Sequence, residues 1–387
     1  MALQTPGMTT SYDQSATYIL SLDQMVDSIL LDDADVLSTL GFSSEGKPVT
    51  QTKHEWDEDE LNPVTVTAGR ILESAVSATG SALVLTSTAH AGRITAGTLL
   101  MDQLSGKNEV LQVTAVSGKS ATVTRGYGGT SAETHGATAI YDIISNPRPQ
   151  GMEGPKDESV ARSRSYNYTQ IFSKGVRLSG TALAIEHNGI GAEDTYQVDK
   201  RMRELVRELD RTVIMGVRSS ANVVDGTYGT MGGLIDYIKH ATSGNTTSTV
   251  ETLVPSVLNA MIKQIWDDGG SPDMVLVGGA QKQKISAFDK EYRRSTMDSR
   301  RAGFTVEEFV SDLGISLRVV VDRWIPSDMA IVIDSSRVMI KPLQGRSFFL
   351  EKLAKTGDSE NWQIVGEYTM EVKQAAKAHA IHWNLKQ

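Results

Sequence analysis

The chain has 387 residues, which is too long for one simple core. This length predicts two or three domains. With 40% hydrophobic and 22% charged residues the chain matches folded soluble proteins, and with no cysteine it excludes disulfides, thiolate metal sites and cysteine nucleophiles. A net charge of -9 argues against a protein whose main task is to neutralise DNA phosphates.

The N-terminal part predicts an arm followed by a short helix. Residues 1–17 are polar and small, which indicates an extended arm without a signal peptide. No apolar run approaches a membrane span in length, so we expect synthesis in a cytoplasm and no membrane partner. Residues 20–31 have an apolar helical face opposite an acidic one. That acidic face is either solvated or a docking surface for a basic partner or a neighbouring copy.

Two polar, strand-like segments lie far apart in the sequence. Residues 49–56 and residues 163–172 alternate polar residues with aromatic ones and lack an apolar face sufficient for a core. We expect them to pair as the two legs of one long hairpin. A two-stranded ribbon with so little apolar surface is marginal alone, so it should find partners on another subunit.

Between the legs, residues 64–143 are rich in Thr, Val, Ala, Ser and Gly. Strand patterns recur at short spacing over residues 64–67, 82–86, 98–102, 109–116, 120–125 and 139–143. They predict a small inserted all-β module, a sandwich or a barrel. The run at residues 124–130, TRGYGGT, lacks the lysine and helix of a phosphate loop and instead indicates a turn with positive φ angles.

Residues 191–218 form the clearest periodic segment. Val198, Met202, Leu205, Leu209 and Val213 follow helical spacing and predict a long amphipathic helix that Gly216 ends. On its polar face we expect ion pairs of Lys200 with Glu204 and of Glu208 with Arg211. Such a helix packs one face onto a sheet.

The rest of the chain alternates helices and strands, which predicts an α+β domain around a sheet. We expect helices over residues 254–266 and 280–288 and strands over residues 274–277, 317–321, 330–334 and 337–342. Residues 290–303 carry five basic residues and indicate an exposed loop, free in solvent or in contact with an acidic neighbour or nucleic acid. Strands over residues 345–353, 362–372 and 378–385 should pack under the long helix.

The sequence offers little catalytic chemistry. The seven histidines are scattered, and the spacing of His379 and His382 on a strand points them to opposite faces, which suits no metal. Serine hydrolase, zinc protease and kinase signatures are absent. We therefore expect a protein that is not an enzyme and that has no cofactor, catalytic residue or metal site.

The order of these parts resembles the major capsid proteins of tailed bacteriophages with the HK97-type fold. More closely, NYTQIFSKGVRLSGTA at residues 167–182, LEKLAKTGDSENWQIVGEYTMEV at residues 350–372 and AHAIHWNL at residues 378–385 resemble the branch typified by the phage SU10 capsid protein. The inserted β-module departs from the minimal pattern of that family.

The resemblance implies an HK97-like α+β fold and the following division. Residues 1–48 would be an N-terminal arm, residues 49–175 an extended loop with the module at about 64–143, residues 176–221 and 345–387 a peripheral domain, and residues 222–344 an axial domain. The function implied is self-assembly into an icosahedral head shell enclosing double-stranded DNA. The candidates for contact between subunits are Trp56, Asp57, Arg162, Arg164, Tyr166, Tyr168, Arg293 and Arg294.

The same resemblance implies a virion protein assembled in a host bacterial cytoplasm. Its partners would be further copies in pentamers and hexamers, a separate scaffolding protein, a portal, and DNA held without sequence specificity; a decoration protein stays open. The alternative is a tail or adhesin protein whose module binds a receptor or glycan. That alternative needs exposed aromatics on the module, where Tyr127 and Tyr141 are available.

Overall fold

The computed structural model divides the chain into two compact units, one of residues 1–56 and 164–387 (the main unit) and one of residues 57–163 (the module unit). No helix in the part of the chain that is described has the length and apolar content to cross a membrane. The structure describes residues 35–40, 48–62, 64–67, 80–103, 106, 108–136, 139–148, 150–151, 159, 161–185, 193–221, 226–241, 244–288, 293–296, 305–355 and 357–386. The predicted arm and the helix at residues 20–31 lie outside these ranges.

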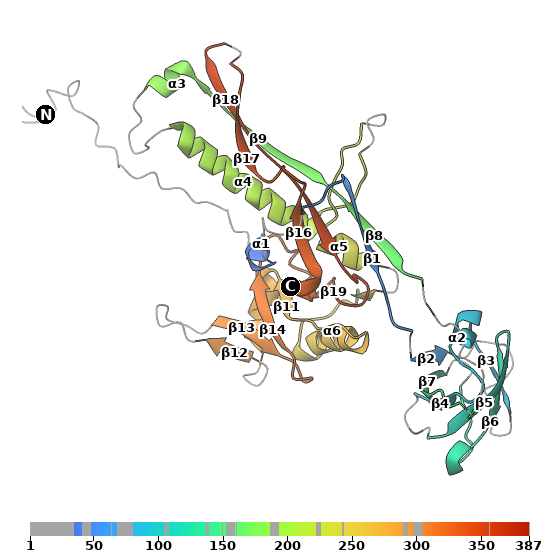
Figure 1. Ribbon diagram of the computed structural model, residues 1–387. Helices are drawn as coiled ribbons and strands as arrows, with labels where there is room; N and C mark the ends of the chain where they lie inside the picture. The colour runs from blue at the N-terminus through green and yellow to red at the C-terminus, as the bar shows by residue number, and fades with distance from the viewer. Residues whose placement is uncertain are drawn as a thin grey trace, which may run out of the picture. The chain divides into compact units, whose positions relative to one another are not determined.

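The predicted long helix is α4 (Glu193–Met215), and it lies along strands β9 (Gln170–Ser179) and β18 (Ser359–Val372) (Figure 1). Leu205, Leu209 and Val213 of its predicted stripe are buried. A Cβ atom at Gly216 would collide with the carbonyl oxygens of Thr212 and Met231, so only glycine allows the chain to turn so tightly there.

The ion pairs predicted along α4 are not the ones that form. Glu204 pairs with Arg201, at 2.6 Å, instead of Lys200. Glu208 pairs with Lys174 of β9, at 3.1 Å, while the guanidinium of Arg211 lies 4.8 Å from the ring centre of Trp324. Helical spacing predicts which charged residues of one helix can pair with each other. It cannot predict a partner on another element, such as Lys174 or Trp324.

The sheet under α4 has β16 (Val338–Pro342) and β17 (Phe349–Leu353) paired along one edge of β18, and β9 along the other. The predicted second leg is longer than expected and divides at Thr169 into β8 (Ser163–Tyr168) and β9. β8 pairs with β1 (Lys53–Glu58), so the predicted hairpin is confirmed. The short helix α3 (Gly180–Ala184) follows β9.

A seven-stranded mixed sheet forms the rest of the main unit, in the order β10-β19-β15-β11-β14-β13-β12. Alternate residues of β11 face two apolar cores, Met274 and Leu276 on the side of α4 and α5, Val275 and Val277 on the side of α6 and α7. A strand buried on both faces has a continuous apolar sequence, which is why residues 274–277 could be predicted. The elements are β10 (Asn245–Thr247), β11 (Met274–Val277), β12 (Arg293–Thr296), β13 (Thr305–Val310), β14 (Ser316–Val321), β15 (Ala330–Ile333), β19 (Ala380–His382), α5 (Leu234–Lys239), α6 (Pro255–Asp267), α7 (Gly279–Ser286) and the 3-10 turn η4 (Ser335–Arg337).

Three expectations for this region need correction. Part of the predicted basic loop is strand β12, which pairs with β13. The last strand, β19, does not join the sheet under α4 but pairs with β15 and β10. Conversely, β16, which was expected in the sheet of the α+β domain, belongs to the sheet under α4. Pairing between strands distant in sequence decides these memberships, and no local pattern encodes it.

The module unit contains all six predicted strands, arranged as one antiparallel sheet in the order β2-β7-β4-β5-β6-β3. The six strands form one continuous sheet instead of two stacked sheets, so the sandwich alternative is wrong, and all six contribute to a single apolar core. The glycine-rich run forms the turn η2 (Tyr127–Gly129), with positive φ at Gly126, Gly128 and Gly129, as predicted. The remaining bounds are β2 (Thr65–Thr67), β3 (Ala82–Val84), α2 (Thr88–Gly92), β4 (Leu99–Asp102), β5 (Val110–Ser117), β6 (Ser120–Thr124) and β7 (Ile140–Ser145).

The N-terminal helix α1 (Asp35–Leu40) docks on the main unit through buried Val36 and Leu37. The backbone N–H of Leu37 donates to Oδ1 of Asp210 on α4, at 2.8 Å. Because a buried carboxylate needs donors, this bond gives the buried Asp210 of α4 a structural purpose that its helical position alone does not reveal.

Candidate functional site

One asparagine fixes the ribbon of β1 and β8 to the rest of the main unit. Oδ1 of Asn167, which is fully buried, accepts hydrogen bonds from the N–H groups of Gly232 (2.9 Å) and Tyr168 (2.8 Å). Its Nδ2 donates to the carbonyl oxygens of Met370 (2.7 Å) and Gly232 (3.2 Å). The amide thus joins the ribbon to β18 and to the loop before α5. Asn167 opens one of the motifs that carry the family resemblance, but its hydrogen-bond partners are distant along the chain and could not be predicted.

The aromatic residues predicted as contacts between subunits lie at the base of the ribbon. Trp56 is 6% exposed, and its ring centre lies 6.0 Å from that of Tyr237 in the core of its own chain. The expectation that the legs lack a core of their own is therefore wrong at the base. Tyr166 and Tyr168 are partly buried and in edge contact, and Lys53 and Arg218 lie 4.4 and 4.7 Å from the Tyr166 ring centre.

The charged candidates lie further along the ribbon and are exposed. Arg162 pairs with Asp59 at 3.5 Å, with side chains 72% and 60% exposed, and Arg164 pairs with Glu55 at 3.4 Å. Asp57 is also exposed. Pairs this open to solvent contribute little to the stability of one chain, so they leave charge available for a partner. Arg293 and Arg294 lie on β12, at the end of the seven-stranded sheet, opposite Phe309 and Glu308 of β13.

A buried carboxylate adds electrostatic attachment at the ribbon base. Glu371 of β18 lies 2.5 Å from Nζ of Lys341, and Nε2 of His54 on β1 is 3.6 Å from its other oxygen. Burial alone would raise the pKa of Glu371, but the contacts with His54 and Lys341 and the charge of Lys373 outweigh it and lower the pKa to about 2. The group is therefore ionised at neutral pH and attracts the ammonium groups of Lys341 and Lys373, while His54 places β1 beside it.

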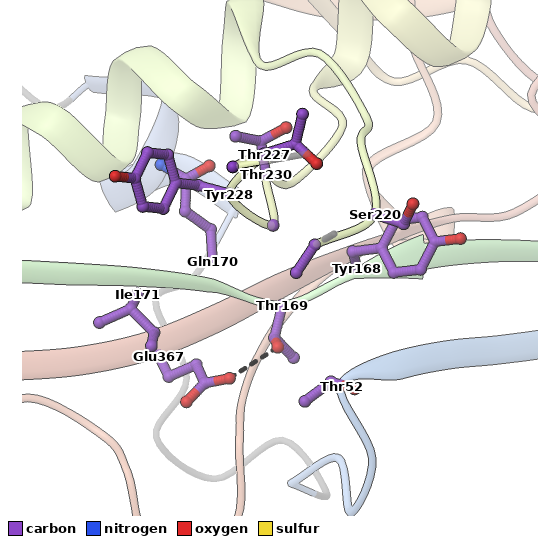
Figure 2. A pocket seen from close by; sticks show the side chains of 13 residues that line it. Thr52, Tyr168, Thr169, Gln170, Ile171, Ser220, Thr227, Tyr228, Thr230 and Glu367 are labelled. Atoms are coloured by element: carbon purple, nitrogen blue, oxygen red, sulfur yellow. Dashed lines mark hydrogen bonds between the residues drawn. The ribbon is translucent and has the colours of Figure 1, made fainter. Parts of the chain in front are cut away.

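A pocket of about 800 Å³ opens where β8 passes into β9 (Figure 2). Its walls are the start of β9, Thr52 before β1, and the loop of residues 226–230. The hydroxyl of Thr169 donates to Oε1 of Glu367 at the floor, at 2.6 Å. Most of the lining side chains carry hydroxyl or methyl groups, which suits binding of a protein segment rather than acid–base chemistry. The sequence indicated a glycine-rich loop here but not a pocket.

The two histidines near the C-terminus lie in the interior of the main unit. Among the residues that the structure describes, no three His, Asp or Glu side chains gather as ligands for a metal ion. His379 is fully buried, and burial lowers its pKa to about 4. His382 is buried beside Glu251, with Nε2 and Oε1 2.7 Å apart. These histidines are structural members of the core.

The whole chain matches one family. The family model of the SU10 major capsid protein covers residues 4–386. The chain belongs to the SU10 major capsid protein family. It is 22% identical over 270 residues to the major capsid protein of Escherichia phage Phieco32, an alignment that covers 57% of this chain and 76% of that protein.

Solved structures similar to this family member come from phages and from an encapsulin. The structure of Microbacterium phage Oxtober96 is 16% identical, with 85% of this chain and 95% of that chain covered and a TM-score of 0.43. The structure of Mycobacterium phage Cain is 15% identical, with 62% of this chain and 79% of that chain covered and a TM-score of 0.41. The structure of the holo-SrpI encapsulin complex of Synechococcus elongatus PCC 7942 is 10% identical, with 58% of this chain and 76% of that chain covered and a TM-score of 0.42.

As a member of the SU10 major capsid protein family, the protein is a structural component of a phage capsid, and its place is the virion. The predicted fold class is confirmed, an HK97-like α+β capsid fold with a long helix, an extended ribbon and an inserted all-β module. The receptor-binding alternative loses one of its two aromatics, because Tyr141 is fully buried while Tyr127 is 38% exposed.

Proposed function

We propose that copies of this protein assemble as pentamers and hexamers into a closed icosahedral head shell that encloses double-stranded DNA. Assembly takes place in the host bacterial cytoplasm, with a separate scaffolding protein and a portal as partners. Membership in a major capsid protein family supports this proposal. The acidic balance of the chain supports a shell that contains DNA without adhering to it, so that contacts with DNA are non-specific.

The ribbon is the observation that carries the proposal. Its base is fixed by the four hydrogen bonds of Asn167 and by buried Trp56, whereas Asp57, Arg162 and Arg164 beyond that base are exposed. A rigid base with an exposed charged extension suits a clasp that reaches an adjacent subunit. Arg162 and Arg164 would meet acidic groups of that neighbour, and Arg293 and Arg294 on β12 would meet others across an axis of the shell.

In this proposal the parts keep the division that the resemblance implies. Residues 1–48 act as an arm, residues 49–175 as the extended loop, residues 176–221 and 345–387 as the peripheral domain and residues 222–344 as the axial domain. Two strands cross these limits, since β16 pairs in the peripheral sheet and β19 in the axial one. The two domains therefore share strands and should move as one body.

Electron microscopy of the purified protein, with light scattering across a salt series, tests the proposal. We expect closed shells, or rings of five and six copies. A persistent monomer or trimer, even with scaffolding protein added, would count against a shell. Arg164→Glu should reduce the yield of shells, whereas Lys263→Glu, an equal charge reversal at a 63% exposed side chain on α6, should leave it unchanged.

A further inference from the structure

An exposed leucine follows the outer end of β1. Leu61 is 94% exposed, more than any other large apolar side chain in the described residues, and Asp59 and Glu60 precede it. An isolated exposed leucine is ordinary on a protein surface. Here it lies between strands β1 and β2, in a protein that belongs to a capsid protein family.

The pocket at the β8–β9 junction has the size and chemistry to receive such a side chain. Its volume of about 800 Å³ exceeds that of one leucine and leaves room for the flanking backbone. Ile171 and Tyr228 line it with 58% and 86% of their surface exposed, so apolar area is open to solvent. At the floor, Glu367 pairs with Arg346 at 2.9 Å, and the Arg346 side chain remains 42% exposed. That guanidinium can meet an acidic flank.

The length of the chain argues that the pocket is not for its own leucine. Thr52 lines the pocket and directly precedes β1. The six residues of β1 extend about 20 Å at 3.3 Å per residue. Only three further residues lead to Leu61, and these reach back at most about 11 Å even when fully extended. The Cα atom of Leu61 therefore stays at least roughly 9 Å from Thr52 of its own chain while β1 stays a strand, which favours a leucine from another copy as the side chain that enters beside Thr52.

We propose that Leu61 of one copy inserts into the pocket between β9 and the loop of residues 226–230 of a neighbouring copy, with Asp59 and Glu60 beside Arg346. The inference rests on the proposed shell and specifies where the clasp attaches. The leucine supplies the buried apolar anchor, and the carboxylates set its direction through charge complementarity.

Cysteine cross-linking tests the contact, since the chain has no cysteine of its own. Leu61→Cys and Ile171→Cys would be placed on separate chains, mixed, assembled and oxidised, so that any disulfide between the two sites joins different copies. The control mixture combines Leu61→Cys with Val250→Cys, which is 67% exposed and lies outside the pocket. We expect a dimer band several-fold stronger from the first mixture than from the control.

The outcomes separate the two proposals. Shells that form without a cross-link above the control overturn the Leu61 contact and leave the shell intact. Failure of the unmodified protein to form shells or rings overturns the shell itself. As a second measurement, Leu61→Ser should lower shell yield while Val64→Ser, at a 70% exposed valine nearby, should not. Equal yields from the two variants would contradict the anchor.

Discussion

The two units of this protein solve the problem of a stable interior differently. The main unit has two apolar cores, one on each face of its seven-stranded sheet, covered by helices. The module unit has one small apolar core, and beside it a cluster of buried charges. Oε2 of Glu109 lies 2.6 Å from Nη2 of Arg125 and 2.9 Å from Nε2 of His135, and Nδ1 of His135 lies 2.8 Å from Oδ2 of Asp102.

The contacts of this cluster are directional. Both ring nitrogens of His135 face carboxylate oxygens, one of Asp102 and one of Glu109, and Arg125 contacts the same carboxylate of Glu109. We infer that the module, which can bury little apolar volume, uses these directional contacts to specify its turn geometry, at a cost in desolvation.

The comparison predicts its largest effect at Glu109. Glu109→Gln removes the carboxylate that both Arg125 and His135 contact and leaves a largely buried guanidinium without its counter-charge, so the module should lose about 3–5 kcal/mol of unfolding free energy. Hydrogen exchange of peptides from residues 109–125 measures it. Asp142→Asn, which alters a partly buried carboxylate of the same unit that accepts from neutral Gln103, is the control. Unchanged exchange in Glu109→Gln would mean that the cluster does not stabilise the module.

In the main unit the matching change is Leu209→Ala. Leu209 is fully buried on the inner face of α4, and the cavity left by its truncation should cost about 2–5 kcal/mol of unfolding free energy. All five tryptophans belong to the main unit, so urea unfolding followed by tryptophan fluorescence reports that unit alone. Met215→Ala, at a 38% exposed position of the same helix, should change the midpoint little. Equal midpoints for the two variants would refute the assigned packing of α4.

Acid should lower the stability of both units, because each contains a buried carboxylate with a lowered pKa, Glu109 in the module unit and Glu371 in the main unit. Burial would raise the pKa of Glu109, but bonds from Arg125, the Glu133 N–H and His135 outweigh it and lower the pKa to about 2. A depressed pKa stabilises the fold above the unfolded value of about 4.5, and that stabilisation is lost as pH falls from there to about 2. The loss amounts to roughly 3 kcal/mol.

The measurement is hydrogen exchange of both units between pH 5 and pH 2.5, corrected for the intrinsic pH dependence of exchange. In Glu109→Gln the acid sensitivity of the module peptides should shrink, while that of peptides around Glu371, whose pKa is also about 2, should persist. A module that stays equally acid-sensitive in Glu109→Gln would assign its acid response to other groups.

The same contrast explains what the sequence could predict. Helix α4 and strand β11 follow from apolar periodicity, and the six strands of the module follow from alternation and turn residues. The Asn167 bonds, the Glu109–His135 cluster and the pocket at Thr169 all join residues distant along the chain, and polar residues carry no periodic signal of such pairing. The sequence thus predicted elements and fold class better than the contacts that hold the ribbon.

The smallest expected effect lies on the outer face of α4. Arg203 and Asp199 form an i,i+4 pair at 3.1 Å with side chains 48% and 63% exposed, a similar contact to that of Arg125 with Glu109 but in solvent. Water already solvates both charges, so Arg203→Ala should cost no more than about 0.5 kcal/mol in tryptophan-detected urea unfolding. High salt should remove even this difference by screening, while it should leave the loss in Glu109→Gln nearly intact. A cost of Arg203→Ala above about 1 kcal/mol would show that burial is not what separates the two pairs.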